Sequence, residues 1–379
     1  MVTIAVTAEA THEPRVAISP ETAKKLVALG CAVKIQSGAG LRSRFSDEAY
    51  RTAGASIVAT ASEAAGGADI LLAVGRPDPA EAKALKPGGL VIAMLDPFAD
   101  RAGLDQLAAT GATAFTMEFM PRISRAQSMD VLSSQANLAG YKAVIDAAAM
   151  FDQAMPMMMT AAGTVPAAKV FIMGVGVAGL QAIATARRLG AIVTATDVRP
   201  ATKEQVASLG AKFIAVEDDE FKQAQTAAGY AKPMSPAYQA KQAELVATHI
   251  KGQDIVITTA LIPGRPAPRL ITRAMVESMK PGAVIVDLAA ERGGNCELTK
   301  AGEIADVGGV RISGPLNLAG TVPVNASSLY AKNLYTFLET LIDKKEKVLK
   351  INWDDEVVKG TLVAKDGKIV HPNLQEKVA

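Results

Sequence analysis

The chain has 379 residues, 49% of them hydrophobic, and its 40 basic residues nearly balance its 38 acidic residues. This length suits two domains of ordinary size, each with a core of its own. The near-neutral charge, and the lack of a basic run interleaved with aromatic residues, exclude nucleic acid from the expected partners. No stretch reaches the roughly 18 uninterrupted apolar residues of a membrane span, and residues 1–15 predict a first strand rather than a signal peptide.

The cysteines of the chain are Cys31 and Cys296, which lie far apart in the sequence. Neither has the neighbouring ligands that a metal site requires. Lone cysteines of this kind are typical of a reducing compartment, so we expect free thiols, no metal and a cytoplasmic location.

The first third of the chain alternates short apolar segments with amphipathic ones. Ser19, Pro20 and Glu21 form a helix start, and Gly30 follows as a helix end, so residues 20–29 are predicted to be helical. The alternation favours a parallel sheet with helices on both faces. The expected strands are 31–36, 69–74, 89–95 and 113–119, and the expected helices are 46–54, 79–85 and 100–110.

A second series of the same kind follows a predicted helix at 138–152 and a Met-rich segment at 155–166, which we expect to be packing or linker rather than a binding surface. A further helix at 327–343 and a hairpin at 357–370, with its turn at Asp366 and Gly367, are expected to return to the first domain. The second-series strands are expected at 169–173, 191–196, 211–216, 254–260 and 283–289.

The sequence GVGVAG lies between a predicted strand and a predicted helix, and Asp197 ends the following strand. This order of strand, glycines, helix, strand and acid is typical of a dinucleotide-binding fold. The helix N-terminus would bind the pyrophosphate, while Asp197 would accept hydrogen bonds from the adenosine ribose and repel a 2′-phosphate. NAD(H) is therefore expected rather than NADP(H), although the cation of Arg199 weakens that selection; a glycine-rich turn without a ligand is the alternative. The six residues of the turn are Gly174, Val175, Gly176, Val177, Ala178 and Gly179.

Residues 217–253 separate two expected strands and exceed what one crossover helix needs. A helix at 238–250 accounts for part of this length. The rest, about 217–237, is predicted to be a mobile loop that covers the site, with Gly229 and Tyr230 in contact with the nucleotide. A solvated insertion is the alternative.

Residues 122–140, RISRAQSMDVLSSQANLAG, carry a guanidinium, amides, hydroxyls and a carboxylate. A helix through Met129, Leu132, Ala136 and Ala139 would bury one apolar stripe and present polar groups elsewhere. Dehydrogenases of alcohols or amines need a general base, yet of the three histidines only His12 is a candidate, and a surface role suits it better than His249 or His371. Hydride transfer between two nicotinamide rings needs positioning instead of a base.

Several long motifs resemble the NAD(H)-binding component of the proton-translocating NAD(P) transhydrogenases, over essentially the whole chain. They include RISRAQSMDVLSSQANLAGYKAVIDAA, MMMTAAGTVPAAKVFIMGVGVAGLQAIATARRLGA, TDVRPATKEQV, GYAKPM, ITTALIPGRPAP and DLAAERGGNC. The resemblance implies an α/β fold with two Rossmann-like doubly wound domains and a cleft between them. The expected domains are 1–137 plus about 320–379, and 138–319.

The resemblance also implies a homodimer that associates with a membrane-spanning subunit and with a component carrying NADP(H), at the cytoplasmic side of the inner membrane. Hydride would pass from NADH to NADP+, coupled to proton translocation. The implied catalytic residues are Arg122, Gln127, Asp130 and Ser133, of which Gln127 reaches toward the NADP(H) ribose. The implied cofactor residues, beyond the glycine turn, are Asp197, Val198, Arg199, Gly229, Tyr230, Ala260 and Leu261.

Two other functions remain open from the sequence, an alanine or related amino-acid dehydrogenase and a noncatalytic NADH-sensing module. Alanine dehydrogenases belong to the same superfamily, and their substrate lysine and histidine would fall near Gly75-Arg76 and Met94-Leu95. Arg15 is the remaining match to their substrate site. A helix-capping and interdomain hydrogen-bond role is the alternative for the polar residues of 122–140.

Overall fold

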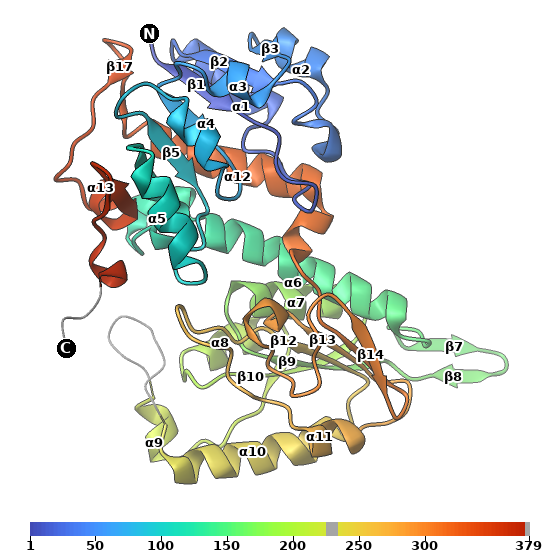
Figure 1. Ribbon diagram of the computed structural model, residues 1–379. Helices are drawn as coiled ribbons and strands as arrows, with labels where there is room; N and C mark the ends of the chain where they lie inside the picture. The colour runs from blue at the N-terminus through green and yellow to red at the C-terminus, as the bar shows by residue number, and fades with distance from the viewer. Residues whose placement is uncertain (225–233, 376–379) are drawn as a thin grey trace. The chain divides into compact units, whose positions relative to one another are not determined.

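A computed structural model describes residues 1–224 and 234–375 of the chain. The molecule divides into two compact units, which we call unit 1 (residues 1–135 and 319–379) and unit 2 (residues 136–318). Each unit contains one large sheet in which most strands run parallel (Figure 1). The predicted α/β class with two doubly wound, Rossmann-like sheets is therefore confirmed.

The described part of unit 1 forms an eight-stranded sheet in the order β19-β18-β6-β5-β4-β1-β2-β3. Strands β1 to β6 are parallel, and β18 and β19 add an antiparallel edge. The strand order reverses between β1 and β4, which makes a topological switch point there. The strands are β1 (Thr3–Val6), β2 (Ala32–Gln36), β3 (Ser56–Val58), β4 (Ile70–Leu72), β5 (Leu90–Ala93), β6 (Thr113–Thr116), β18 (Leu362–Lys365) and β19 (Lys368–Ile369), with a separate pair β16 (Ile342–Asp343) and β17 (Val348–Leu349).

Helices cover both faces of this sheet because alternate residues of each strand point to opposite sides. Ile4 and Val6 of β1 pack in one core with α1 and α12, while Ala5 packs in another with α3, α4 and α5. Ser19 caps α1 as predicted, by accepting the N–H of Thr22. The helices are α1 (Pro20–Ala28), α2 (Asp47–Thr52), α3 (Ala61–Ala65), α4 (Pro79–Lys83), α5 (Arg101–Ala109), α12 (Pro323–Leu338) and α13 (Glu356–Thr361).

The described part of unit 2 forms a seven-stranded sheet in the order β11-β10-β9-β12-β13-β15-β14. All neighbours are parallel except β14 and β15. Here the order reverses between β9 and β12. The strands are β9 (Lys169–Met173), β10 (Ile192–Thr196), β11 (Lys212–Phe213), β12 (Ile255–Thr258), β13 (Val284–Asp287), β14 (Ile304–Val307) and β15 (Val310–Ser313).

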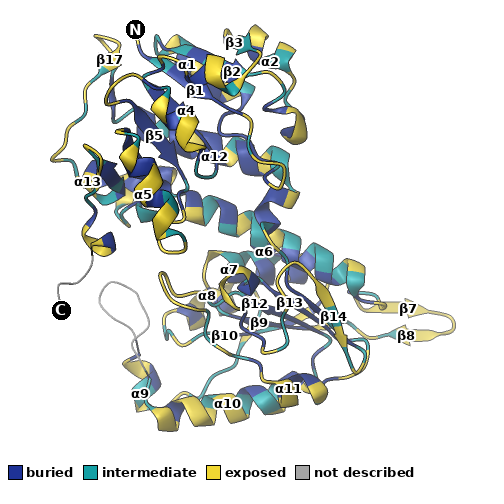
Figure 2. Cartoon of the chain, in the orientation of Figure 1, coloured by how far each residue is buried: buried dark blue, intermediate teal, exposed yellow. Residues whose placement is uncertain are grey.

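Strand β9 is buried on both faces of this sheet. Val170 and Ile172 pack with α6 and α7, whereas Phe171 and Met173 pack with α10 and α11, and the strands lie as a buried layer between exposed outer helix faces (Figure 2). No helix of the described residues is long and apolar enough to cross a bilayer. The helices are α6 (Val131–Met150), α7 (Val177–Arg188), α8 (Thr202–Ser208), α9 (Asp219–Lys222), α10 (Pro236–Ile250) and α11 (Arg273–Glu277).

The C-terminal hairpin is shorter than predicted. Asp366 and Gly367 form its turn with φ angles of 52° and 77°, as a two-residue hairpin requires, but the first predicted strand is wrong over residues 357–361, which belong to α13. Asp355 caps that helix by accepting the N–H groups of Val357 and Val358. This N-cap outweighs the strand-like alternation of the residues that follow.

Two predicted strands also end early. The segment predicted at 113–119 forms β6 only to Thr116 and continues as a 3₁₀ helix, Met117–Phe119. The segment predicted at 211–216 pairs only at Lys212–Phe213. In both cases the apolar run extends beyond the paired residues, because burial alone does not require strand pairing.

The Met-rich segment forms a separate hairpin of β7 (Met158–Thr160) and β8 (Gly163–Val165), which projects from unit 2 (Figure 1). Met157, Met158 and Met159 are 56%, 42% and 78% exposed. The prediction of packing or linker is therefore wrong for these three side chains. Local turn geometry explains the hairpin, since the Thr160 hydroxyl donates to the Gly163 carbonyl across its end.

Candidate functional site

The predicted glycine turn joins β9 to α7 at the carboxyl end of the unit 2 sheet, next to the switch point between β9 and β12. Gly174 has a φ of 98°, in the left-handed region that favours glycine. A Cβ added to Gly179 would lie 1.9 Å from the Gly174 carbonyl oxygen, so only glycine lets α7 pack this closely on the turn. Both assignments agree with the roles that the sequence predicted.

Gly176 differs from the other two glycines of the turn. A Cβ added there would meet no atom of the chain within 4 Å, and its φ of −80° suits any residue. Neither packing nor backbone conformation therefore requires glycine at this position. The open space lies at the N-terminus of α7, where backbone N–H groups and the helix dipole favour an anion. The turn thus fits the pyrophosphate of a dinucleotide.

Asp197 follows β10 and connects the second strand to the glycine turn. One of its oxygens, Oδ2, accepts the N–H of Val175 at 2.8 Å. Arg199 pairs with the same carboxylate at 2.8 Å, and the Asp197 side chain is only 7% exposed. The side-chain hydrogen bonds to Asp197 raise the pKa of Arg199. The acid predicted to select the ribose is thus placed beside the phosphate turn, and it is already paired with a cation.

Ala260 and Leu261 follow β12, the strand beside β9, and Asn295 holds this segment. The Asn295 side chain accepts the N–H of Ala260 at 3.0 Å and donates to its carbonyl at 2.8 Å. Thr259 bonds the same segment to the glycine turn, since its hydroxyl donates to the Gly174 carbonyl at 3.0 Å. Sequence reasoning missed Thr259 and Asn295, although both lie inside motifs that carried the family resemblance. No spacing rule marks them, because their role depends on contacts between strands.

Apolar side chains are exposed around the same end of the sheet. Val177 begins α7, Val198 follows β10 and Leu261 follows β12, and they are 39%, 39% and 52% exposed. Flat aromatic rings such as adenine bind on apolar side chains of this kind, which leave water when covered. The strand ends therefore supply a phosphate cradle, a carboxylate and apolar contacts at one edge.

The candidate residues of the 122–140 segment lie in unit 1. Arg122 and Gln127 are exposed, and Asp130 lies between a 3₁₀ helix, Ser124–Met129, and the start of α6. Asp130 caps α6, since its carboxylate accepts both the N–H and the hydroxyl of Ser133. The helix-capping alternative is therefore part of what Asp130 and Ser133 do.

The apolar stripe predicted for this segment is wrong. Met129 is buried, but Leu132 is 49% exposed, and Val131 is fully buried in its place. The physical reason is the break at Asp130: a 3₁₀ helix before it and an α-helix after it do not share one helical period. A single stripe therefore cannot run through both parts.

Arg15 is buried and engaged within unit 1. Its guanidinium donates to both carboxylate oxygens of Glu13, at 2.8 and 2.7 Å, and to the Gln135 side-chain oxygen at 2.9 Å. Gln135 in turn donates to the Ala326 carbonyl at 3.1 Å. Arg15 thus ties the loop after β1 to the first turns of α6, which is a structural use of the residue that matched an amino-acid dehydrogenase site.

A hollow of about 280 Å³ lies at the carboxyl ends of β1, β4 and β5 in unit 1. Glu9, His12, Arg76 and Asp96 contribute to its lining, and Arg76 is paired with Asp100. Burial raises the pKa of Glu9 to about 7, although its carboxylate accepts the N–H groups of two residues after β4. The substrate lysine and histidine expected of an alanine dehydrogenase are replaced here by Gly75-Arg76 and Met94-Leu95.

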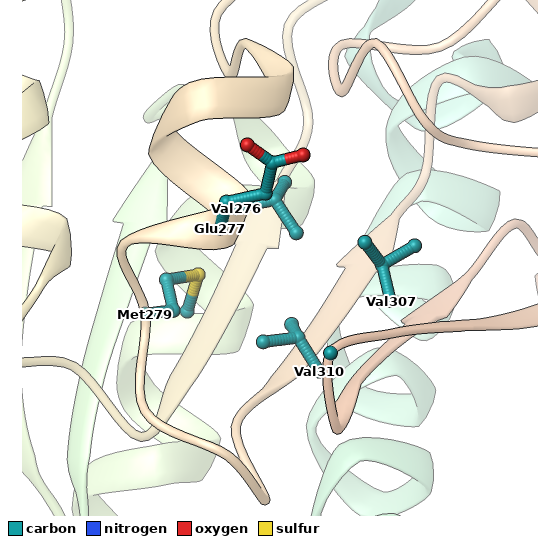
Figure 3. Close-up of a pocket in the computed structure, with 6 residues that line it drawn as sticks. Val276, Glu277, Met279, Val307 and Val310 are labelled. Carbon is teal, nitrogen blue, oxygen red and sulfur yellow. The ribbon is translucent and has the colours of Figure 1, made fainter.

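A second hollow, of about 250 Å³, lies in unit 2 between α11 and the turn that joins β14 to β15 (Figure 3). Val276, Met279, Val307 and Val310 line it, with Glu277 at its rim. The Gly309 carbonyl in this turn accepts the N–H of Gly282 just before β13. The hollow therefore lies at the amino end of the parallel strands, opposite the glycine turn, and contributes nothing to the nucleotide site.

The remaining predicted residues have other positions. His249 bonds the Thr194 hydroxyl at 2.9 Å and packs edge-on against Phe171, and burial lowers its pKa. His371 caps a C-terminal 3₁₀ helix, Pro372–Leu374. Gly229 and Tyr230 lie outside the described residues, and among the described residues no group of His, Cys, Asp and Glu is arranged to hold a metal.

Comparison with known proteins gives matches over nearly the whole chain. The alanine dehydrogenase/PNT N-terminal domain matches residues 5–139 and the alanine dehydrogenase/PNT C-terminal domain matches residues 143–372. An NAD(P) transhydrogenase alpha subunit of Rhodospirillum rubrum is 55% identical over 367 residues, 96% of each chain. The crystal structure of transhydrogenase from Sinorhizobium meliloti is 58% identical, covers 98% of this chain and 100% of that one, and has a TM-score of 0.88. A solved L-alanine dehydrogenase is 26% identical, covers 99% of this chain and 98% of its own, and has a TM-score of 0.82.

Proposed function

Because the chain belongs to the alanine dehydrogenase/PNT family, we propose that it is the NAD(H)-binding component of a proton-translocating NAD(P) transhydrogenase. In this reaction hydride passes directly from NADH on this chain to NADP+ on a partner component. The observation that carries the proposal is the glycine turn at the switch point of unit 2, in a chain that is 55% identical to a transhydrogenase alpha subunit.

The residues after the strands of unit 2 bind the nucleotide in this proposal. The N-terminus of α7 binds the pyrophosphate, Asp197 accepts the adenosine ribose, and Val198 and Leu261 cover the adenine. When bound, NADH supplies the hydride. The proposed cofactor-binding residues are Gly174, Val175, Gly176, Val177, Ala178, Gly179, Asp197, Val198, Arg199, Gly229, Tyr230, Ala260 and Leu261.

The residues of unit 1 orient the reacting ring. We assign Arg122, Asp130 and Ser133 to the nicotinamide carboxamide, and Gln127 to the NADP(H) ribose on the partner component. Gln127 is exposed, as a group that reaches another component must be. None of the four has to remove a proton, because hydride transfer between two nicotinamides needs close apposition of the rings and no general base.

The proposed assembly follows from the relatives that are named as subunits. The chain forms a homodimer and associates with a membrane-spanning subunit and an NADP(H)-binding component, on the cytoplasmic side of the inner membrane. Proton translocation takes place in the membrane subunit and is coupled to the hydride transfer. A component of this kind carries one nicotinamide and depends on its partner for the other.

Reconstitution tests the proposal. The purified chain is mixed with the membrane subunit and the NADP(H)-binding component in vesicles, and NADH oxidation is followed with NADP+ as acceptor. The proposal predicts turnover that requires every component. Tight NADH binding without transfer would instead indicate a sensing module, and turnover of the chain alone with pyruvate, ammonia and NADH would indicate an amino-acid dehydrogenase.

Gln127→Asn tests the role of this side chain within the complex. The change shortens the side chain by one methylene, and misplacement of about 1 Å can cost on the order of a hundredfold in rate. We expect near-normal NADH affinity and assembly but loss of most single-turnover hydride transfer. Gln106→Asn, at an exposed position of α5, is the matched control. Wild-type transfer in Gln127→Asn would assign this residue a structural role.

A further inference from the structure

The carboxylate of Asp197 is fully occupied by donors from its own unit. Oδ1 accepts the backbone N–H and the Nε–H of Arg199, each at 2.9 Å. Oδ2 accepts the N–H of Val175 and an Nη2–H of Arg199, each at 2.8 Å. An ionised carboxylate has about four lone-pair sites, so these four bonds leave no site open.

A ribose that binds at Asp197 must therefore displace a donor. The two backbone N–H groups belong to the glycine turn and to the chain after β10, and they are fixed by the fold. The guanidinium of Arg199 is the movable donor, since it is attached through a flexible side chain that is 27% exposed. Arg199 and the ribose hydroxyls thus compete for the same oxygen atoms.

Arg199 also changes the charge that a nucleotide meets. A bare aspartate would repel the 2′-phosphate that distinguishes NADPH from NADH, but here the carboxylate is paired with a cation. Arg199 donates in addition to the Val175 carbonyl at 3.1 Å, which holds the guanidinium next to the phosphate turn. A guanidinium displaced from Asp197 is a suitable partner for a phosphate, because its planar set of N–H groups matches phosphate oxygens.

We propose that Arg199 is a specificity-determining residue that narrows the preference of this chain for NADH over NADPH. It does so in two ways, by competing with the NADH ribose for Asp197 and by offering a cation to the 2′-phosphate of NADPH. This inference rests on the proposed binding of NADH at the glycine turn. It assigns to Arg199 the opposite effect on selectivity from that of Asp197, two residues earlier.

The test compares Arg199→Met and Arg199→Lys with the wild type by equilibrium titration with NADH and with NADPH. Arg199→Met removes both the competing donors and the cation, so NADH should bind about tenfold more tightly and NADPH about tenfold more weakly, each the equivalent of one charge-assisted hydrogen bond. Arg199→Lys keeps the cation but cannot donate in the bidentate manner. It should bind NADH more tightly while keeping the NADPH affinity of the wild type.

Arg188→Met is the matched control, since it removes the same charge from an exposed position in the last turn of α7. It should leave both affinities unchanged. Thermal denaturation with and without NADH checks that each variant is folded. An unchanged ratio of the two affinities in folded Arg199→Met would overturn the inference while leaving the proposed function intact. If the wild type bound neither nucleotide, the proposed function itself would fail.

Discussion

At the scale of single residues, Gly176 and Gly179 belong to one turn but have separable roles. Gly176→Ala adds a methyl group into open space at the helix N-terminus, whereas Gly179→Ala drives one into the Gly174 carbonyl. We expect Gly176→Ala to keep the wild-type free energy of unfolding and to bind NADH more weakly. Gly179→Ala should lose about 1–3 kcal/mol of stability, the usual cost of overpacking. Urea denaturation and NADH titration of both variants measure the two effects.

The contrast between these variants is the informative result. Equal loss of stability in both would show that Gly176 is also required by packing. NADH binding of wild-type strength in a folded Gly176→Ala would show that the pyrophosphate does not approach the backbone there. Either outcome would contradict the assignment of this turn.

Glu9 carries a pH-dependent contribution to stability. Burial raises its pKa in the folded chain to about 7, from an ordinary value of 4.5. Between these two values the folded state binds more protons than the unfolded state, so stability falls as the pH rises through this window and levels off above it. We expect the free energy of unfolding of the wild type, relative to that of Glu9→Gln, to decrease from about pH 4.5 to pH 7.

Urea denaturation at several pH values in this window measures the difference. Glu48→Gln, at an exposed carboxylate of α2, serves as the control and should show no comparable trend. A constant difference between wild type and Glu9→Gln across the window would contradict the raised pKa. An increase with pH would reverse its sign.

At the scale of elements, Asp130 both caps α6 and is proposed to hold the nicotinamide, and two substitutions separate these roles. Asp130→Ala removes the acceptor of the Ser133 N–H and should cost about 1 kcal/mol of stability, as loss of an N-cap does. Asp130→Asn keeps a side-chain oxygen as a cap but removes the charge. It should retain stability yet reduce single-turnover hydride transfer in the assembled enzyme. If Asp130→Asn transferred hydride as fast as the wild type, capping would be the whole role of this residue.

Elements with strong local signals could be predicted from the sequence. Helix α1 has its N-cap and proline at Ser19 and Pro20, and the structure begins it at the expected residue. The hairpin turn at Asp366 and Gly367 also follows from local chemistry. The errors arise where two local signals compete, as at Asp355, whose cap makes a helix of residues that alternate like a strand.

At the scale of the whole molecule, the family resemblance and the doubly wound sheets predicted from the sequence are confirmed. The two glycines that the fold requires could be predicted, because a fixed spacing marks them. Thr259 and Asn295 could not, since they act between segments brought together by the sheet. The same holds for Arg199, whose occupation of Asp197 depends on side-chain geometry that no motif encodes.

The central claim is that hydride passes directly between two nicotinamides, and isotope transfer tests it most directly. The assembled enzyme is given NADP+ and NADH that carries deuterium at both C4 positions, in ordinary water, and the NADPH formed is analysed by mass spectrometry. We predict one deuterium in each NADPH molecule, because no proton exchange intervenes when the rings are apposed. NADPH without deuterium, its hydrogen drawn from the solvent, would contradict direct transfer and with it the proposed function.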